Sequence, residues 1–450
     1  MLINFTVSNF KSIKDEILFN MAPAKRLQTM KDHVLVANTK KQAEAMPVGA
    51  IYGANGSGKT NFIEAISFMK ERIKNDDVIP AIPFRLADDD QEKLPSTFSV
   101  LFSFQKVVYG YGFSVQGRVV TQEWLSAYFS AKETMLFERY LEDGKPQIDF
   151  GQKLISSTKG GKSFLGFIFQ GMQEDQLFLR EAVKRDVSLL QPVEKWFSEH
   201  VFVLDPSSRA IALEVILQRQ PQTLQHMNDQ LLEMGMHLEK LETKEKKFNF
   251  DQYASQLDEK DAESFRNSLE EMQEDDIIEL SITRFGRPQC VQKKNNELYL
   301  TTLEICHERQ DGTHVSFDIS TASNGFMRML DLLPALAFAK NEDTLIVVDE
   351  IESSLHTLLS QYFIKAFIET VTRSQNGSQL VFSTHDTNLL DSDLLRSDEI
   401  WFMEKDSCSS SQLCNLVEFI LSTGLNYEKG YLAGRFGAIP IFHGNSLRIK

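Results

Sequence analysis

Hydrophobic and polar residues alternate at the start of the chain and then give way to a helical pattern. Ile3, Phe5 and Val7 are separated by polar neighbours, which predicts a short strand. A second apolar run, PVGAIYG, ends at Gly53 and predicts another strand. Over residues 59–75 the apolar positions follow the spacing of a helix. This first segment is therefore expected to form a strand, a loop, a second strand and a helix.

Apolar and polar residues alternate again over residues 97–128. One face of the first strand there carries the apolar side chains of Phe98, Val100, Phe102 and Phe104, and the string VVYGYGFSV follows as the next strand. A further alternating strand completes the stretch. The pattern predicts an antiparallel sheet lobe.

Residues 162–267 show apolar spacings of three and four, which predict a mainly helical middle. One stripe runs at alternating steps of three and four through Leu224, Met227, Leu231, Met234, Leu238 and Leu241. A short coiled-coil seam and an ordinary core face both fit this stripe, and the core face is favoured because fewer than three heptads are present. Residues 251–279 hold eleven acidic and two basic side chains, which favours a solvated face over an acidic contact for a partner.

After Leu280 alternating strands return, and then helices and strands take turns. The expected elements are a helix over 326–339, a strand over 345–348, a helix over 355–371 and a strand over 379–383. Strands that alternate with helices imply a parallel sheet covered by helices. The fold class predicted from the pattern is α/β.

Composition narrows the class of protein. Hydrophobic residues make up 42% of the 450 residues and charged ones 25%, as in an ordinary globular chain. The longest apolar stretches, such as LLPALAFA, fall far short of the ~20 residues that cross a bilayer. The N-terminus lacks the apolar core of a signal peptide, so a cytoplasmic protein with no membrane partner is expected. The four cysteines show no metal-ligand spacing and are expected to be reduced.

The net charge of −15 argues against a protein that binds nucleic acid over its whole surface, because phosphate contacts need clustered Lys and Arg. A local basic groove stays open. Its candidate is the compact cluster of Arg284, Arg287, Lys293 and Lys294.

Residues 53–60 read GANGSGKT, a G-x-x-x-x-G-K-T phosphate loop between a predicted strand and a predicted helix. Glycines let backbone N–H groups surround phosphate oxygens, and the helix N-terminus adds the positive end of its dipole. Lys59 would reach the β- and γ-phosphates of ATP, and the Thr60 hydroxyl would bind Mg²⁺. The ATP-binding residues expected from the motif are Gly53, Ala54, Asn55, Gly56, Ser57, Gly58, Lys59 and Thr60.

Two later strands end in polar residues of the same chemistry. The string TLIVVDEIESSLH resembles a Walker B motif, in which Asp349 holds the Mg²⁺ shell and Glu350 polarises the attacking water. A strand end that turns into solvent is the alternative. QLVFSTHD predicts a neighbouring strand that ends at His385, which would contact the γ-phosphate and the water unless it is a structural histidine.

The string STASNGFMRML places Ser323 and Gly325 at the start of a helix before the Walker B strand. It resembles the signature motif of ABC-type ATPases, in which a serine hydroxyl and a helix N-terminus bind the γ-phosphate held by a second subunit. A plain helix N-cap is the alternative.

These motifs, with NFKSI near the N-terminus, occur in an order that is similar to the ATPase heads of chromosome-maintenance and DNA-repair proteins and of OLD-type nucleases. The strings ESSLH, THDTNLLD, DEIWFMEKD and GRFGAIP resemble more closely the ABC-type ATPase subunits, often labelled AAA, of bacterial abortive-infection and phage-defence systems such as AbiL, PARIS and Septu. The resemblance implies that Phe10, Lys11 and Ser12 lie near the nucleotide. A solvated strand edge is the alternative for these three residues. The resemblance also implies that residues 353–356 communicate across a dimer, and a helix N-cap is the alternative for that segment.

The chain departs from the family pattern in its signature, where Asn324 and Phe326 replace the acidic residue and the threonine that relatives often carry. The contact expected from residue 326 is therefore in doubt, and no lobe-coupling glutamine can be assigned. An OLD-type nuclease would need a metal-binding domain after His385 for which the sequence leaves no room. The resemblance then implies a separate effector protein.

Three parts are expected: residues 1–160 and 281–450 as the two halves of an ATPase head, and 161–280 as a helical insertion. The favoured hypothesis is an ATPase, a homodimer or higher homo-oligomer with sandwiched ATP, that serves as sensor or regulatory subunit of an anti-phage defence system. A DNA-binding repair or chromosome-maintenance ATPase is the alternative. A metabolic P-loop kinase is disfavoured by Ser323, Glu350 and His385 together.

Overall fold

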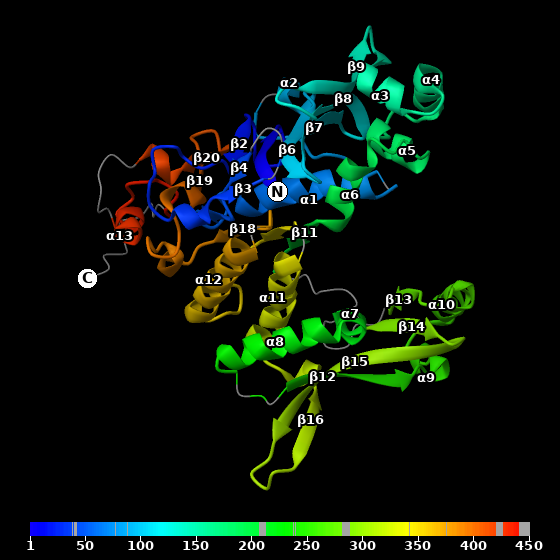
Figure 1. The fold of residues 1–450 in the computed structure, drawn as a ribbon, viewed down its shortest axis with the longest axis vertical. Coiled ribbons are helices and arrows are strands. Elements are labelled where there is room, and N and C mark those ends of the chain that lie inside the picture. The colour runs from blue at the N-terminus through cyan, green and yellow to red at the C-terminus, as the bar shows by residue number, and fades with distance from the viewer. Residues whose placement is uncertain are drawn as a thin grey trace. The chain divides into compact units, whose positions relative to one another are not determined.

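A computed structural model describes residues 1–37, 39, 43–76, 78–87, 89–206, 213–236, 238, 240–280, 289–341, 343–374, 376–419 and 426–440. The chain divides into two compact units (Figure 1). The first unit comprises Met1–Pro206, Phe338–Glu352 and Phe363–Lys450, and the second comprises Ser207–Ala337 and Ser353–Tyr362. Two helices, α11 (Asn324–Asn341) and α12 (Thr357–Ser374), run through the boundary.

An antiparallel sheet forms the lobe of the first unit. In spatial order its strands are β10 (Lys145–Phe150), β9 (Thr134–Glu142), β8 (Val119–Tyr128), β7 (Val107–Gln116), β6 (Ser96–Phe104), β1 (Leu2–Ser8) and β2 (Ile17–Asn20). The predicted alternation in β6 is confirmed, because Phe98, Phe102 and Phe104 are all buried. The N-terminal strand joins this antiparallel sheet through β6.

The second sheet of this unit is parallel except at one edge. Its order is β11 (Val201–Leu204), β17 (Leu345–Val348), β18 (Gln379–Thr384), β5 (Val48–Tyr52), β19 (Ile400–Lys405) and β20 (Ser411–Asn415), with only β20 antiparallel to its neighbour. Every residue of β5, β17 and β18 is buried, as the continuous apolar runs predict for strands covered on both faces. The predicted α/β class with an antiparallel lobe is confirmed.

The helices of the first unit are α1 (Lys59–Lys74), α2 (Asp89–Glu92), α3 (Gln152–Ser157), α4 (Gly161–Gly171), α5 (Phe178–Lys184), α6 (Gln191–Glu199) and α13 (Tyr427–Leu432). Short 3-10 turns are η1 (Lys31–His33), η3 (Thr387–Leu389), η4 (Ser397–Glu399) and η5 (Leu416–Glu418), and β3 (Leu35–Val36) pairs with β4 (Glu44–Ala45).

Residues 161–204 belong to this first unit, although they were expected in the insertion. The Trp196 ring of α6 stacks on Phe102 of β6 with centroids 4.0 Å apart. The buried Glu123 carboxylate of β8 accepts hydrogen bonds from the backbone N–H groups of Phe178 and Leu179 at 2.6 and 3.0 Å. Helices α5 and α6 therefore dock on the lobe, a tertiary contact that sequence spacing does not reveal.

The second unit contains both strands and helices. Its sheet runs β12 (Lys240–Lys247), β15 (Glu297–Glu308), β14 (Cys290–Lys294) and β13 (Ile277–Glu279), and β16 (His314–Asp318) also pairs with β15. The other elements are α7 (Leu213–Arg219), α8 (Pro221–Glu233), α9 (Phe250–Ala254), α10 (Glu259–Glu271) and the 3-10 turn η2 (Ile319–Thr321). The description of residues 161–280 as helical is thus corrected, because β11, β12 and β13 lie within that range.

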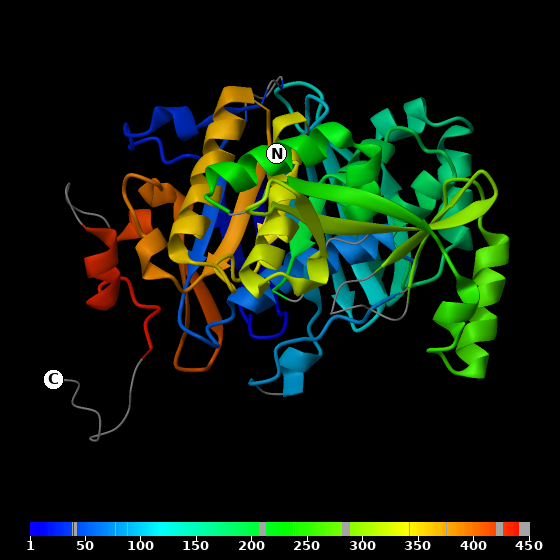
Figure 2. The same cartoon turned by 90° about the horizontal axis from the view of Figure 1, so that it is seen from below.

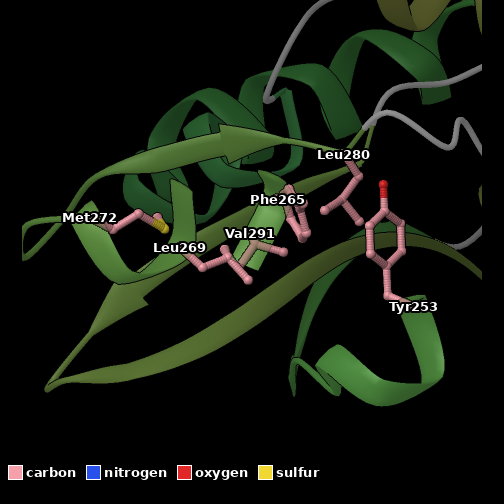
Figure 3. Packing of buried hydrophobic residues seen from close by; sticks show 6 residues of the cluster. All are labelled: Tyr253, Phe265, Leu269, Met272, Leu280 and Val291. Carbon is pink, nitrogen blue, oxygen red and sulfur yellow. The ribbon is translucent and has the colours of Figure 1, made fainter. Parts of the chain in front are cut away.

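Helices cover both faces of this small sheet. Val291 of β14 packs with Tyr253, Phe265 and Leu269 of α9 and α10, in the cluster drawn in Figure 3. The adjacent Cys290 packs with Val215 of α7. Neighbouring residues of a strand point to opposite faces, so α7 lies on one side and α9 and α10 lie on the other.

The long Leu/Met stripe is also corrected. Helix α8 ends at Glu233, because Gly235 adopts a left-handed φ of 72° and the Met236 N–H bonds back to the Leu231 carbonyl at 3.0 Å. Leu241 lies in β12, not in the helix. Only the first part of the stripe is a helix face, which agrees with the core-face interpretation.

Two expectations from composition can be compared with the structure. Each of the four cysteines is a thiol, as predicted. In the part of the chain that the structure describes, no helix has the length and apolar character needed to cross a membrane.

Candidate nucleotide-binding site

The parallel sheet brings three of the predicted motifs to one edge. Strands β17, β18 and β5 are neighbours, and Val348 pairs with Phe382 while Thr384 pairs with Tyr52. Their carboxyl ends therefore lie side by side, followed by Asp349, His385 and the phosphate loop. Ligands of open α/β sheets bind at this edge.

The phosphate loop has the backbone shape that its glycines allow. Gly56 and Gly58 adopt left-handed φ values of 79° and 111°. A Cβ on Gly58 would also collide with the Ser411 hydroxyl of β20. That hydroxyl donates to the Ser57 carbonyl at 2.7 Å, so β20 holds the loop in place from one side. Asn55 and Gly56 are exposed at its tip.

Lys59 is buried at the start of α1, with only 7% of its surface exposed. Its ammonium donates to the Gly53 carbonyl at 2.7 Å and to the Ala54 carbonyl at 3.3 Å. Burial lowers the pKa of Lys59, against the opposing charges of Glu352, Asp349 and Glu350. The cation is thus held inside the loop, within electrostatic reach of the acidic residues after β17.

Asp349 and Glu350 share one supporting hydroxyl. The Ser383 Oγ of β18 donates to the buried Asp349 carboxylate and accepts the Glu350 N–H at 2.8 Å. Glu350 has a left-handed φ of 48°, which an L-residue adopts only when its surroundings impose it. The hydroxyl of Ser383 therefore holds both the Asp349 carboxylate and the backbone turn at Glu350.

His385 is held by an acidic neighbour. Its Nδ1 lies 2.9 Å from the Glu352 Oε1, which also accepts the His385 N–H at 2.8 Å. The ring is 53% exposed, whereas the Glu352 side chain is 11% exposed. The Glu352 carboxylate therefore orients an accessible imidazole directly after β18.

The site fits a nucleotide with a magnesium ion. The Ser57 Oγ inside the loop is buried and has no hydrogen-bond partner among the described residues, and the Thr60 side chain is exposed. The residues that the structure describes contain no cluster of three or more His, Cys, Asp or Glu side chains able to hold a metal. Mg²⁺ usually binds through one or two protein groups and substrate phosphates. The Thr60 hydroxyl and the Asp349 carboxylate are oxygen ligands of this kind.

The three residues predicted near the nucleotide from NFKSI have different surroundings. Phe10 is buried and packs against Phe68 and Phe98, with ring centroids 5.5 and 5.2 Å apart. Lys11 forms an ion pair with Glu64 of α1. Only Ser12 reaches the phosphate loop, because its hydroxyl lies 2.8 Å from that of Ser411 and next to Gly58.

The predicted signature residues lie in the second unit. Helix α11 begins at Asn324, and the Ser323 hydroxyl accepts the Phe326 N–H at 3.3 Å, the contact of an N-cap. A Cβ on Gly325 would lie 2.7 Å from the Ser354 carbonyl, so the signature touches the segment 353–356. His356 precedes α12, and its Nδ1 accepts the Leu358 N–H at 3.2 Å.

The basic cluster is only partly described. Arg284 and Arg287 lie outside the described residues. Lys293 donates to the Met272 carbonyl at 2.8 Å, and Lys294 forms an ion pair with Glu245. Both lysines are therefore engaged within the second unit.

Sequence reasoning missed the residues that support the motifs. Ser383 and Glu352 have a local signal, since each lies within three residues of a predicted site residue in the strings STHD and DEIE. Ser411 has none, because its contact with the loop joins residues 354 positions apart.

A protein-family profile with the description "AAA domain, putative AbiEii toxin, Type IV TA system" matches residues 49–391, more than half of the chain. The "SMC head domain from Thermotoga maritima" aligns with 92% of this chain and 98% of its own, at 11% identity and a TM-score of 0.36. A structure of "the SmcHead bound to the C-winged helix domain of ScpA" aligns with 96% and 99%, at 13% identity and a TM-score of 0.38. No curated protein sequence matches the chain.

Proposed function

The chain belongs to the AAA domain family described for the AbiEii toxin, and from this premise we propose that it is an ATPase that acts as a nucleotide-controlled switch. The observation that carries the proposal is the gathering of Lys59, Asp349 and His385 at one edge of a parallel sheet. Each of these side chains is supported by hydrogen bonds from neighbouring strands or loops. The proposed function has two parts, ATP hydrolysis and control of a partner protein.

Mg-ATP supplies, when bound, a phosphoryl group and the divalent charge that balances its oxygens. Lys59 exchanges its bonds to the Gly53 and Ala54 carbonyls for phosphate oxygens. The backbone N–H groups around Gly56 and Gly58 face the same phosphates, and Thr60 and Asp349 are the candidate magnesium ligands. Burial makes the Lys59 charge more effective, because the local dielectric is lower than in water.

Glu350 is the candidate base that takes a proton from the attacking water. Its backbone is fixed through Ser383, so the point from which the side chain extends is set before any nucleotide binds. His385 is the candidate hydrogen-bond partner of the γ-phosphate and the water. The Glu352 carboxylate holds the Nδ1 side of the ring, which leaves Nε2 for that contact.

Pairing of two copies supplies the remaining contact in this proposal. Ser323 lies at the N-terminus of α11, a helix of 18 residues, so hydroxyl and helix dipole are both available to an anion. Together with Gly325 it would bind the γ-phosphate held by a second copy. ATP would then stabilise a homodimer, and hydrolysis would release it.

The output of this switch is proposed to be control of a separate effector, a nuclease or toxin, in an anti-phage defence system. The family description, which names a toxin, supports this role, as do the strings ESSLH and GRFGAIP of the defence-type ATPases. Slow hydrolysis would suit such a protein, because the signal is the state of assembly and not the turnover of ATP.

The first experiment measures the molar mass and the hydrolysis rate of wild type and Glu350→Gln, with and without Mg-ATP, by light scattering and phosphate release. Removing the base should slow hydrolysis by at least about 100-fold, as general bases contribute about 10²–10⁴-fold. ATP should then trap Glu350→Gln as a dimer. The matched control is Glu369→Gln, because the Glu369 side chain lies on the surface of α12, where it forms an ion pair with Arg373.

A second variant tests the contact in trans. Ser323→Arg should bind ATP with wild-type affinity and fail to gain mass in the Glu350→Gln background. Unchanged hydrolysis and unchanged mass in Glu350→Gln would refute the mechanism. Dimerisation that survives Ser323→Arg would refute the role of the signature alone.

A further inference from the structure

The end of the described chain returns to the phosphate loop. Residues 427–440, here termed the C-terminal hook, consist of α13 and the turn that follows it. The Ala438 carbonyl accepts the backbone N–H of Ala54, the second residue of the phosphate loop, at 2.9 Å. Both views show α13 (red) near the orange segment that holds β19 and β20 (Figures 1 and 2).

The hook presents that carbonyl through an unusual backbone turn. Gly437 and Ala438 have left-handed φ values of 67° and 59° in succession. The Ala438 N–H donates to the Glu404 carboxylate at 2.8 Å, and the Tyr431 hydroxyl donates to the same Ala438 carbonyl at 2.9 Å. The backbone of Ala438 is thus held by three hydrogen bonds, and its carbonyl oxygen accepts from both the hook and the loop.

Aromatic packing fixes the hook to β19 and to β5, the strand that precedes the loop. The rings of Tyr431 and Phe436 stack on Phe402 of β19, with centroids 5.4 and 5.2 Å apart. Tyr431 also meets the ring of Tyr52, the last residue of β5, at 6.3 Å. The hook therefore contacts the chain immediately before the phosphate loop as well as Ala54 within it.

Space around Gly437 admits no other residue in this arrangement. A Cβ there would collide with the carboxylate of Glu404, which is the group that holds Ala438. The left-handed φ of Gly437 also penalises any side chain. Glycine is favoured at this position by its left-handed φ, and a side chain there would displace the Glu404 carboxylate from Ala438.

We propose that the C-terminal hook is a positioning element for nucleotide binding, which holds Ala54 and with it the backbone of the phosphate loop in place. This inference rests on the proposed function. No hook residue touches the nucleotide in this scheme; the hook acts by preorganising the loop, which reduces the ordering cost of binding. Because the loop meets the α- and β-phosphates that ATP and ADP share, loss of the hook contact weakens both nucleotides alike.

The test measures the dissociation constants of Mg-ADP and of a non-hydrolysable Mg-ATP analogue by titration calorimetry on full-length variants. Gly437→Ala introduces the collision with Glu404, and Ala438→Pro forbids the left-handed φ and removes the N–H. Each should weaken both nucleotides by roughly five- to tenfold, the effect of about one hydrogen bond. Ala438→Gly keeps the carbonyl and accepts the same φ, so it should retain wild-type affinity.

Two further variants separate positioning from folding. Tyr431→Phe keeps the stacked ring and removes only the hydroxyl, so it remains informative if Ala438→Pro does not fold. It should weaken both nucleotides by a few-fold, with only a small fall in the thermal midpoint without nucleotide, because one hydrogen bond is lost. Leu432→Ala is the control, because Leu432 is 60% exposed on the same helix.

Folded Gly437→Ala, Ala438→Pro and Tyr431→Phe proteins that bind nucleotide as tightly as wild type would overturn the hook proposal. A fall in thermal midpoint with unchanged affinity would overturn it as well, since that result marks a structural role only. Failure of wild type to bind any nucleotide would overturn the proposed function itself, and is recognised before any variant is made.

Discussion

At the scale of single residues, the conformation of Asp349 and Glu350 after β17 depends on Ser383, which has no role of its own in the proposed reaction. Ser383 donates to Asp349 and accepts from the Glu350 N–H, so one hydroxyl serves two neighbouring groups. Glu350 holds a left-handed backbone conformation, which costs on the order of 1–3 kcal/mol for a residue other than glycine. The serine is one of the contacts that maintain this conformation.

Ser383→Ala should therefore lower the free energy of unfolding by about 1–3 kcal/mol, because it removes both hydrogen bonds from buried partners. It should also slow ATP hydrolysis, since Glu350 is no longer fixed. Urea unfolding and phosphate release measure the two effects. Ser198→Ala is the control, as its hydroxyl makes only an exposed contact with the Lys195 carbonyl. An unfolding free energy equal to wild type would contradict the role assigned to Ser383.

At the scale of elements, a buried polar network joins the N-terminal segment to the turn η4. His33 Nδ1 lies 3.0 Å from the Glu399 carboxylate, and both side chains are almost fully buried. Arg396 donates to the Thr29 carbonyl at 2.7 Å and pairs with Asp398, which in turn accepts the Ala24 N–H. These contacts link two segments more than 360 positions apart.

Stability should depend on pH through His33. Burial alone would lower its pKa, but the hydrogen bond and charge of Glu399 outweigh burial and raise the pKa above 6.5. A raised folded-state pKa contributes stability that is complete below pH 6.5 and is lost as the pH rises through the folded value. Urea unfolding at pH 6 and pH 9 should show this loss in wild type and a smaller one in His33→Gln. Equal losses in the two proteins would exclude the pair as its source.

The cluster between α10 and the small sheet has its own prediction. Phe265 packs with Tyr253, Leu269 and Val291, so Phe265→Ala should destabilise the second unit by about 3–5 kcal/mol. Because the phosphate loop belongs to the first unit, ADP affinity should stay at the wild-type value. Limited proteolysis followed by mass spectrometry would locate the earlier cleavage within residues 213–337. A parallel loss of ADP affinity would show that the two units do not fold independently.

At the scale of the whole molecule, the charge balance separates the two function hypotheses. The net charge is −15, and the described lysines of the basic cluster are engaged with Met272 and Glu245. Lys247 and Lys244 of β12 are likewise paired with Glu297 and Glu304. Of these four lysines of the second unit, three form ion pairs within the unit and Lys293 bonds a backbone carbonyl.

Binding to duplex DNA should accordingly be weak and independent of ATP at about 0.15 M salt, where exposed charges are screened over about 8 Å. Fluorescence anisotropy with a labelled duplex, at several salt concentrations and with and without Mg-ATP, measures this. Tight binding that rises with ATP and falls steeply with salt would favour the DNA-repair hypothesis instead. A charge-reversing Lys294→Glu variant would then show whether this cluster carries the contact.

Much of the fold could be predicted from the chain alone, for a definite reason. Buried parallel strands such as β17 and β18 are continuous apolar runs, and β6 alternates, so their periods identify them. Helix α8 was predicted too long, because a stripe at steps of three and four continues past Gly235 and into the strand that contains Leu241. The spacing of hydrophobic residues identifies a helix or a strand more reliably than it locates the residue at which that element ends.

The sequence by itself determined the candidate residues for the phosphates, because the loop motif is local: its glycines, Lys59 and Thr60 lie within eight consecutive residues. It also determined that Asp349 and His385 end strands, since polar residues follow apolar runs there. Only the tertiary structure decided what holds these groups. Ser383 supports Asp349, Glu352 orients His385, and Ala438 meets Ala54 through hydrogen bonds between segments distant in sequence. Such contacts depend on which strands become neighbours in the sheet, and no local pattern of side chains specifies that order.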